Sequence, residues 1–237
     1  FASPGPVEAG SLIAYGGETT SAVSAADGGP RWTVKVGSER GLAAGSGIVA
    51  ALDSSLVALD ARTGRKRWTY AFEPNQFAGL VCGGGLVFAG DESGVLHAVR
   101  ADDGEAAWTV ETGFTGSLAF GDGIVYTCDF LGDTVAVLAA TGAVLWTATI
   151  GAGEGRFYGH ANTLGLIGGT LLVTATDKSL RALDRTNGSP LWTYSADVTP
   201  TSAAAATGGL FFAGTRDGRV VALEPPAGGG GATASGR

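Results

Sequence analysis

The sequence contains no methionine, two cysteines, two histidines and only 15 lysine and arginine residues among its 237 positions. With 22 acidic residues the net charge is −7, whereas a nucleic-acid-binding surface normally needs a basic face. No uninterrupted apolar run approaches the roughly 18 to 20 residues that a bilayer-spanning helix requires. We therefore expect no nucleic-acid partner and no membrane contact within this segment.

The chain is also poor in the residues that build helical bundles. It has 41 glycines and scattered Val, Thr, Trp and Phe, which favour many short strands joined by tight turns. The glycines do not recur at every third position, so a collagen-like structure is excluded. A hydrophobic fraction of 45% is sufficient for a core. Because the sequence starts at Phe1 without a signal-peptide pattern, we expect a mature form or an excised domain.

Tryptophans recur at nearly constant intervals of 36, 40, 38 and 46 residues, which indicates a repeated supersecondary unit. The five are Trp32, Trp68, Trp108, Trp146 and Trp192. Ten residues before each stands an alanine: Ala22, Ala58, Ala98, Ala136 and Ala182. Four residues before each stands a glycine: Gly28, Gly64, Gly104, Gly142 and Gly188. A threonine follows every one of the five tryptophans, so the repeat extends over several aligned positions.

Further apolar runs lie upstream of each tryptophan segment, so each unit predicts four antiparallel strands joined by hairpins, A to D. A sixth copy covers residues 222–233, with Ala232 at the tryptophan position. Units of about 40 residues with four strands have the size of a propeller blade. We predict an all-β fold, a β-propeller of six four-stranded antiparallel blades over residues 1–226. Residues 227–237 are interpreted as a Gly-rich segment, either a degenerate last strand or a linker.

The repeated residues have a physical explanation within this fold. A small alanine on strand C leaves room where adjacent blades press together, and tryptophan on strand D can lie across the neighbouring blade. Its indole N–H can then donate to a backbone acceptor. The glycine before it permits positive φ in the turn between strands C and D. The five tryptophans are therefore predicted to dock neighbouring blades.

The pattern Ala-Leu-Asp-x-x-Thr/Asn-Gly-x-x-x-Trp, intact at residues 58–68 and 182–192, resembles the tryptophan-docking repeat of the quinoprotein-like (PQQ-type) β-propellers. The resemblance covers residues 8–233 and implies the fold rather than one activity. Quinoprotein dehydrogenases share this repeat with a non-catalytic bacterial outer-membrane assembly lipoprotein. Sensor domains of bacterial serine/threonine kinases carry it as well.

The resemblance does not extend to the quinone site of the dehydrogenases, which hold the cofactor under a ring formed by adjacent cysteines and position a calcium ion beside it. Cys82 and Cys128 are far apart in the sequence and belong to different blades. We interpret them as two buried thiols, with a disulfide as the alternative. No cofactor and no metal are expected, and PQQ with calcium is the alternative.

Catalytic signatures are missing from the sequence. His97 and His160 are the two imidazole groups, and His97 is predicted to be a partly exposed residue of a strand rather than a catalyst. The chain contains no G-x-S-x-G elbow and no lysine that completes a phosphate-binding loop. The run Gly83-Gly84-Gly85 is interpreted as a hairpin turn, because similar small-residue turns occur in other blades. No catalytic residue is assigned.

A ligand is expected on the face formed by the D–A and B–C loops. The longest departure from the repeat, between Trp146 and Trp192, contains aromatic, basic and amide side chains that suit a small polar molecule or a peptide. The candidate ligand-binding residues are Arg156, Phe157, Tyr158, His160 and Asn162, with Gln76, Phe77 and Phe114 on earlier connections. The alternative is that the aromatic pair packs down and plugs the channel mouth.

Aspartates recur in the B–C turns, where they are interpreted as turn formers with solvated carboxylates. They are Asp53, Asp91, Asp129, Asp133, Asp177 and Asp217. A second interpretation is that together they attract a cation or a basic partner.

The function predicted from the sequence is a non-catalytic, extracytoplasmic propeller that binds a ligand or protein. It is expected to be a monomer and the sensor or scaffold domain of a larger bacterial protein, such as a membrane-anchored serine/threonine kinase. The alternatives are an outer-membrane-assembly-type scaffold and a small PQQ-dependent oxidoreductase. Blade number also has an alternative, a larger ring cut down to six units, which would leave an exposed edge.

Overall fold

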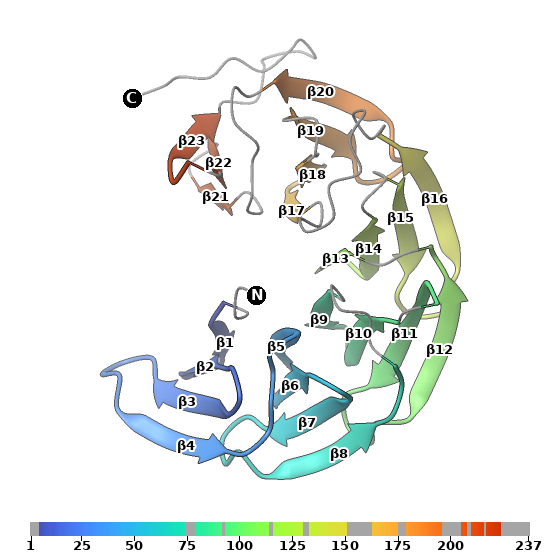
Figure 1. Cartoon of the computed structure of the whole chain (residues 1–237). Coiled ribbons are helices and arrows are strands. Elements are labelled where there is room, and N and C mark those ends of the chain that lie inside the picture. The colour runs from blue at the N-terminus through green and yellow to red at the C-terminus, as the bar shows by residue number, and fades with distance from the viewer. Residues whose placement is uncertain are drawn as a thin grey trace. The chain divides into compact units, whose positions relative to one another are not determined.

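The computed structural model describes residues 5–73, 79–91, 93–113, 116–129, 133–150, 163–174, 179–195, 205–207, 210–215 and 217–223. Every regular element in these ranges is a β-strand, and short turns join most consecutive strands (Figure 1). The strands form separate antiparallel sheets, each built from strands that follow one another in the sequence. The predicted all-β class is confirmed.

Three sheets come from the first half of the chain, each with its strands in sequence order. The first contains β1 (Val7–Ala9), β2 (Leu12–Tyr15), β3 (Thr20–Ser24) and β4 (Pro30–Val34). The second contains β5 (Gly41–Gly45), β6 (Ile48–Leu52), β7 (Leu56–Asp60) and β8 (Lys66–Tyr70). The third contains β9 (Leu80–Gly83), β10 (Leu86–Gly90), β11 (Val95–Arg100) and β12 (Ala106–Glu111).

The second half continues the same pattern. The fourth sheet contains β13 (Ser117–Gly121), β14 (Ile124–Cys128), β15 (Asp133–Leu138) and β16 (Val144–Thr149). The fifth contains β17 (Leu164–Ile167), β18 (Thr170–Thr174), β19 (Ser179–Asp184) and β20 (Pro190–Ser195). The sixth contains β21 (Ala205–Thr207), β22 (Leu210–Gly214) and β23 (Val220–Leu223). Its predicted fourth strand falls in residues 224–237, outside the described ranges, and so does the predicted Gly-rich segment.

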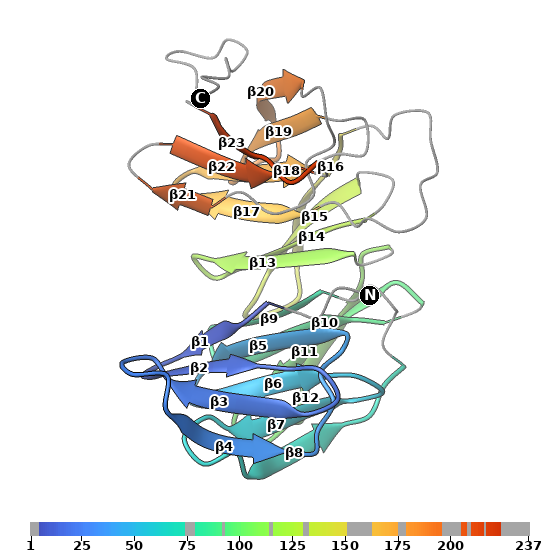
Figure 2. The ribbon, with the colours of Figure 1, turned by 60° about the vertical axis from the view of Figure 1, so that its left-hand side comes forward.

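Six consecutive sheets of this kind are the blades of a β-propeller, as the sequence predicted. The chain divides into two compact units, which are described separately. The N-terminal unit comprises Phe1–Thr115, Asp122–Val125 and Leu138–Ala143, and the C-terminal unit comprises the rest. In the N-terminal unit β5 contacts both β1 and β9, so the first three sheets lie side by side (Figures 1 and 2). The assignment of residues 1–226 to a single domain stays a prediction.

The hydrophobic core lies between adjacent sheets. One cluster joins Ile48, Leu52 and Leu56 of the second sheet to Val87 and Val99 of the third, all of them fully buried. Such layers form because each strand points alternate side chains to opposite faces, and the two faces of the second sheet meet the first and the third sheets. The core of each sheet therefore depends on the sheet beside it.

Each repeated alanine pairs in register with the tryptophan of its own sheet. The pairs are Ala22 with Trp32, Ala58 with Trp68, Ala98 with Trp108, Ala136 with Trp146 and Ala182 with Trp192. A register shift follows the alanine in all five ladders. A small side chain is thus placed directly opposite a large indole across the strand pair.

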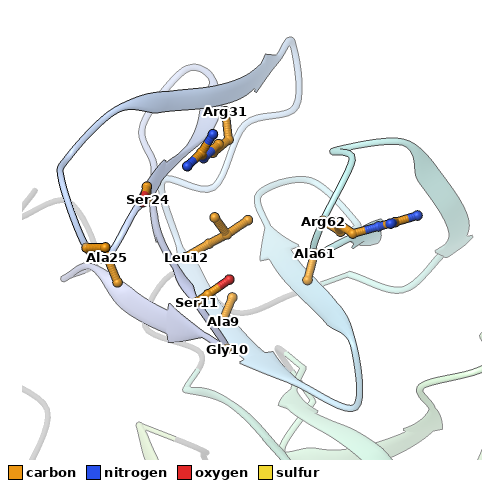
Figure 3. Close-up of a pocket in the computed structure, with 10 residues that line it drawn as sticks. Ala9, Gly10, Ser11, Leu12, Ser24, Ala25, Arg31, Ala61 and Arg62 are labelled. Atoms are coloured by element: carbon orange, nitrogen blue, oxygen red, sulfur yellow. The ribbon is translucent and has the colours of Figure 1, made fainter.

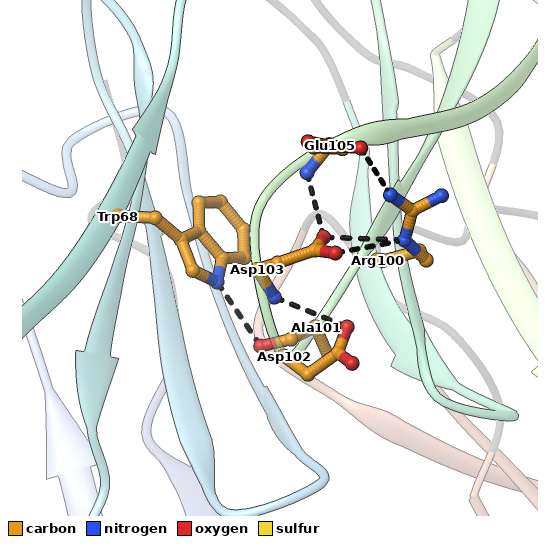
Figure 4. A network of polar contacts seen from close by, with 6 residues as sticks. All are labelled: Trp68, Arg100, Ala101, Asp102, Asp103 and Glu105. Atoms are coloured by element: carbon orange, nitrogen blue, oxygen red, sulfur yellow. Dashed lines mark hydrogen bonds and ion pairs between the residues drawn. The ribbon is translucent and has the colours of Figure 1, made fainter.

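Four tryptophans donate a hydrogen bond to the next sheet along the chain. The Nε1–H groups of Trp32, Trp68, Trp108 and Trp146 donate to the carbonyls of Ala61, Ala101, Ala139 and Arg185 at 2.9, 3.0, 2.8 and 3.0 Å. Each acceptor stands seven residues before the tryptophan of its own sheet. Figure 4 shows the contact of Trp68, whose ring lies against the turn that carries Asp102 and Asp103.

Glycine has a second role in these turns. The four glycines that receive a tryptophan are Gly64, Gly104, Gly142 and Gly188, with φ of +71°, +78°, +76° and +73°. A Cβ atom built on any of them would lie 2.6–2.8 Å from a carbon of the preceding sheet's tryptophan. Sequence reasoning explained the glycine by its positive φ alone. The structure adds that the indole occupies the space of a side chain.

Polar contacts inside the turn hold the docking surface in shape. In the third sheet the Arg100 guanidinium pairs with the carboxylates of Asp103 and Glu105, and the Glu105 amide donates to Asp103 (Figure 4). These groups are exposed, so each ion pair contributes little to stability. Their effect is to fix the turn whose carbonyl receives Trp68.

Candidate functional site

None of the eight candidate ligand-binding residues can be placed. Arg156, Phe157, Tyr158, His160, Asn162, Gln76, Phe77 and Phe114 all lie outside the described residues. Their assignment stays a prediction, and so does the alternative in which the aromatic pair plugs the channel mouth. What the structure does describe is the start of the second D–A connection and several B–C turns.

A cluster of aromatic and ionisable side chains lies at this end of the N-terminal unit. It consists of Tyr70 at the end of β8, Phe72 just after it, His97 on β11 and Asp91 in the turn before β11. His97 Nδ1 lies 3.0 Å from the Tyr70 hydroxyl, and Nε2 lies 2.9 Å from Asp91 Oδ2. We call these four residues the aromatic–acid cluster.

Ring contacts complete the cluster. The Phe72 ring centroid lies 5.0 Å from that of His97 and 5.7 Å from that of Tyr70. Leu80 and Cys82 belong with Tyr70 and Phe72 to the border of the core between the second and third sheets. The Tyr70 and Phe72 rings remain half-buried, so the cluster presents aromatic surface beside a carboxylate.

Asp91 is held by several donors. Its Oδ1 accepts hydrogen bonds from the amides of Ser93 and Val95 and from the Ser93 hydroxyl, at 2.8–2.9 Å. Partial burial raises the pKa of this carboxyl, but the hydrogen bonds from His97, Val95 and Ser93 together lower the pKa below its usual range. Asp91 therefore carries a negative charge at neutral pH.

Proton positions follow from these neighbours. Burial, and secondly the Asp91 charge, raise the pKa of the Tyr70 phenol, which is therefore protonated and donates to His97 Nδ1. The Nε2 proton of His97 is then donated to Asp91. Both imidazole nitrogens are engaged, and the imidazole side chain is only 12% exposed. The network fixes the start of the second D–A connection against the third sheet.

Replacing Asp91 with asparagine should lower the free energy of unfolding at pH 7 by about 1–2 kcal/mol, because a charge-assisted bond to His97 is lost. The folded-state pKa of Asp91 is depressed, so its stabilisation is present above the unfolded-state pKa of about 3.9 and lost as the pH falls through the folded value. Urea denaturation at about pH 7, 5 and 3 should therefore show the difference from wild type shrinking with acid. Asp102→Asn, at an exposed turn, is the matched control. A difference independent of pH would contradict this role.

Carboxylates in other B–C turns are also used locally. Asp129 Oδ1 accepts the Asp133 amide at 2.7 Å, and Asp217 accepts the Thr215 hydroxyl at 2.6 Å. These bonds match the interpretation of the aspartates as turn formers. The expectation that their carboxylates are solvated is wrong for Asp129, which is only 8% exposed because the turn folds over it. Asp177 lies outside the described residues.

A pocket lies between the first two sheets, at the end of the strands opposite to the aromatic–acid cluster. It has a volume of about 870 Å³ and is lined by the turns that carry Ser11, Ala25 and Ala61, with Leu12 and Arg31 beside them (Figure 3). In the second sheet Asp60 holds Arg67 at 2.6 Å, and this bond lowers the pKa of Asp60 to about 2. Ser24 and Arg31 stand at the corresponding positions of the first sheet, so the same ion pair cannot form.

Cys82 and Cys128 lie on β9 and β14 of different sheets and are not joined to each other in a disulfide. Burial raises the pKa of Cys82 to about 12, so this thiol is protonated and unreactive at neutral pH. The two thiols therefore do not make the adjacent-cysteine ring of a quinone site. Among the described residues no three His, Cys, Asp or Glu side chains form a group that could hold a metal ion. The described part of the chain has no helix long and apolar enough to cross a membrane.

Comparisons with known proteins agree with the fold. The profile of the family described as outer membrane protein assembly factor BamB matches residues 2–112 and 92–230. The crystal structure of BamB from Moraxella catarrhalis superposes with a TM-score of 0.71 at 20% identity, over 94% of this chain and 73% of that chain. No curated protein matches the sequence.

Two further solved structures share the architecture. The computationally designed Ika8 protein gives a TM-score of 0.73 at 17% identity, over 93% of this chain and 70% of that chain. The structure of U3-55K gives a TM-score of 0.74 at 13% identity, over 94% of this chain and 77% of that chain. At these identities the likeness concerns the fold alone.

Proposed function

The chain belongs to the family of the outer membrane protein assembly factor BamB, and from that premise we propose that it is a non-catalytic β-propeller that binds a protein partner. Its scaffold role would be of the outer-membrane-assembly type. The partner would contact the end of the blades that carries the B–C turns and the D–A connections, where loops lie on a rigid support.

The observation that carries this proposal is the aromatic–acid cluster. Tyr70 and Phe72 are half-buried. Hydrogen bonds hold Tyr70 and His97 in one arrangement, and the Phe72 ring packs against both of them. Rigid, partly exposed aromatic side chains next to a polar rim are typical of protein interfaces. The cluster lies at the start of a D–A connection, and this position supports the proposal that a partner contacts the face that carries these loops.

A binding role fits these residues better than catalysis. The imidazole of His97 has a partner at each nitrogen, and Cys82 is a protonated thiol. Cys82 and Cys128 do not form the ring of adjacent cysteines that covers the quinone in the related dehydrogenases. We propose that the domain works without PQQ or calcium.

The setting of the domain is part of the proposal. We place it outside the cytoplasm, as expected for an assembly scaffold of this family. A role as the sensor domain of a membrane-anchored serine/threonine kinase is the second candidate, and it rests on the repeat shared with such sensors.

Photo-crosslinking tests the proposed face. We expect a benzophenone side chain in place of Glu73, an exposed residue next to Phe72, to give a crosslinked protein of defined mass in the native host. The same group in place of Asp102, exposed at the opposite end of the strands, should give none. Crosslinks from position 102 alone would contradict the assignment of the face. Dye-linked alcohol or sugar oxidation on addition of PQQ and calcium would contradict the non-catalytic role.

A further inference from the structure

The pocket between the first two sheets lies on the face of the first sheet that packs against the second. Leu12, which lines the pocket, belongs to a buried cluster with Val49 of the second sheet. Ser24 pairs in register with Leu12 and therefore points to the same face. The second sheet contributes Ala61 and Arg62 to the lining. Both walls of the pocket thus belong to the N-terminal unit.

The lining of this pocket carries positive charge and no carboxylate. Arg31 and Arg62 are its ionisable groups, and both are exposed. Ser11 and Ser24 add hydroxyl groups, and the remaining positions are alanine, glycine and leucine. In Figure 3 Arg31 lies over Leu12, and Arg62 comes from the opposite wall with its guanidinium turned outward. The volume of about 870 Å³ is within the range of ligand pockets.

Neither guanidinium of the lining is fixed in an ion pair with a described residue. The carboxylate that binds Arg67 in the second sheet has no counterpart in the first, because Ser24 stands at its position. Asp27 is the acid on which the Arg31 charge acts. Hydrogen bonds from the Gly29 amide and then the Ser24 hydroxyl lower the pKa of Asp27, and Arg31 contributes less. Asp27 is thus held mainly by its own turn, which leaves the Arg31 donors for an added anion.

Positive charge extends beyond the two arginines of the lining. Residues 24–31 and 60–67, which form the C–D turns of the first two sheets, carry five of the 15 basic residues and only two acidic ones. The basic residues are Arg31, Arg62, Arg65, Lys66 and Arg67, and the acidic ones are Asp27 and Asp60. In the third sheet the same turn has three acids around Arg100. A negatively charged segment is therefore attracted to the first two turns and repelled by the third.

We propose that this pocket binds a glutamate side chain from an acidic segment of another polypeptide, with the Arg31 and Arg62 guanidinium groups on its carboxylate. The planar fork of an arginine matches a carboxylate in two parallel hydrogen bonds. Arg62 is exposed and unpaired, so its side chain can rotate toward the pocket. The alanine and leucine walls cover the methylene groups of a glutamate, which a hydrated phosphate lacks.

A polypeptide suits this surface better than an extended polyanion. Nucleic acid and anionic membranes require positive charge over a broad face, whereas this chain has a net charge of −7 and an acidic turn in the next sheet. The pocket lies at the end of the strands opposite to the aromatic–acid cluster. The inference therefore rests on the proposed function only in taking a polypeptide as ligand, and it adds a second binding surface.

A synthetic peptide of three glutamates alternating with alanines is the probe. We expect saturable shifts of the Ser11, Ala25 and Arg31 amides in NMR spectra of the full chain when this peptide is added. The same peptide with glutamine in place of glutamate should bind at least about tenfold more weakly, equivalent to about 1.4 kcal/mol. Because both titrations use wild-type protein, their comparison does not depend on the folding of a variant.

Variants of the protein locate the site. Arg31→Gln and Arg62→Gln should each weaken binding by at least about fivefold, and the double variant should abolish the shifts. Lys35→Gln removes the same charge at an exposed position beyond the other end of β4 and should change the affinity by less than about twofold. Circular dichroism checks that all variants remain folded, as expected for exposed side chains.

Several results would overturn the proposal. Equal binding of the two peptides would show that the carboxylate is not recognised, and shifts that persist in the double variant would place the contact elsewhere. Absence of shifts in wild-type protein would be equally decisive. Displacement of the peptide by inorganic phosphate or by vesicles that contain phosphatidylglycerol, bound more tightly, would assign the pocket to phosphate groups. None of these outcomes changes the crosslinks expected from position 73, so the two proposals fail separately.

Discussion

Trp68→Ala is expected to lower the free energy of unfolding by about 3–5 kcal/mol, a loss that follows from the cavity left by a buried indole. Trp68 is 8% exposed and belongs to the core cluster between the second and third sheets. Its removal also leaves the Ala101 carbonyl without its donor in a buried position. For a chain of this length the melting temperature should fall by about 6–20 °C. Urea denaturation followed by circular dichroism measures the change.

Trp68→Phe separates the two contributions. Phenylalanine keeps an aromatic ring between the sheets but has no N–H, so we expect an intermediate loss of about 1–3 kcal/mol. Arg65→Ala, at an exposed position of the preceding turn, is a control that should change stability by less than about 0.5 kcal/mol. A Trp68→Ala variant as stable as this control would show that the docking contact does not hold the two sheets together.

Gly104→Ala is expected to have the second largest effect, a loss of about 2–5 kcal/mol. Part of this loss is the strain of alanine at a φ of +78°, about 1–2 kcal/mol. The rest arises because the new Cβ would lie 2.6 Å from Trp68 Cγ and 2.9 Å from its Cβ. Contacts so near the tryptophan backbone cannot be relieved by rotating the ring.

Gly28→Ala is the matched comparison. Gly28 has a φ of +71° and the same turn, but no described atom lies within 4 Å of its Cβ position. We expect only the backbone strain, about 1–2 kcal/mol. The difference between the two variants, measured by chemical denaturation, isolates the clash with the indole. Equal losses would mean that the Trp68 side chain moves aside at no cost.

The repeat was predictable because its causes are local. Strand propensity, hairpin turns and glycine at positive φ act within about 40 residues, and they recur at Trp32, Trp68 and their equivalents. The aligned positions therefore predicted the sheets, their order and the family resemblance. The family match and the four-stranded sheets confirm these predictions.

The candidate site was predictable only in part. The sequence pointed to the D–A and B–C loops, but the residues that it proposed lie outside the described ranges. Sequence reasoning missed Tyr70, Phe72 and Asp91 as partners of His97. The available signal was an aromatic pair just after the tryptophan of one repeat and a carboxylate in a turn of the next. Nothing in the spacing indicates that the end of β8 lies against β11, because that contact joins two sheets.

The scarcity of basic residues, the abundance of glycine and the spacing of the tryptophans determined the fold class and the repeat. Only the tertiary structure decided what each repeated residue touches. It placed four of the indoles on the glycines of the following sheets and brought His97 between Tyr70 and Asp91. The physical reason is that turn and strand preferences act within one unit. Burial and hydrogen bonding between units depend on which surfaces meet, and identical repeats in sequence therefore acquire different surroundings.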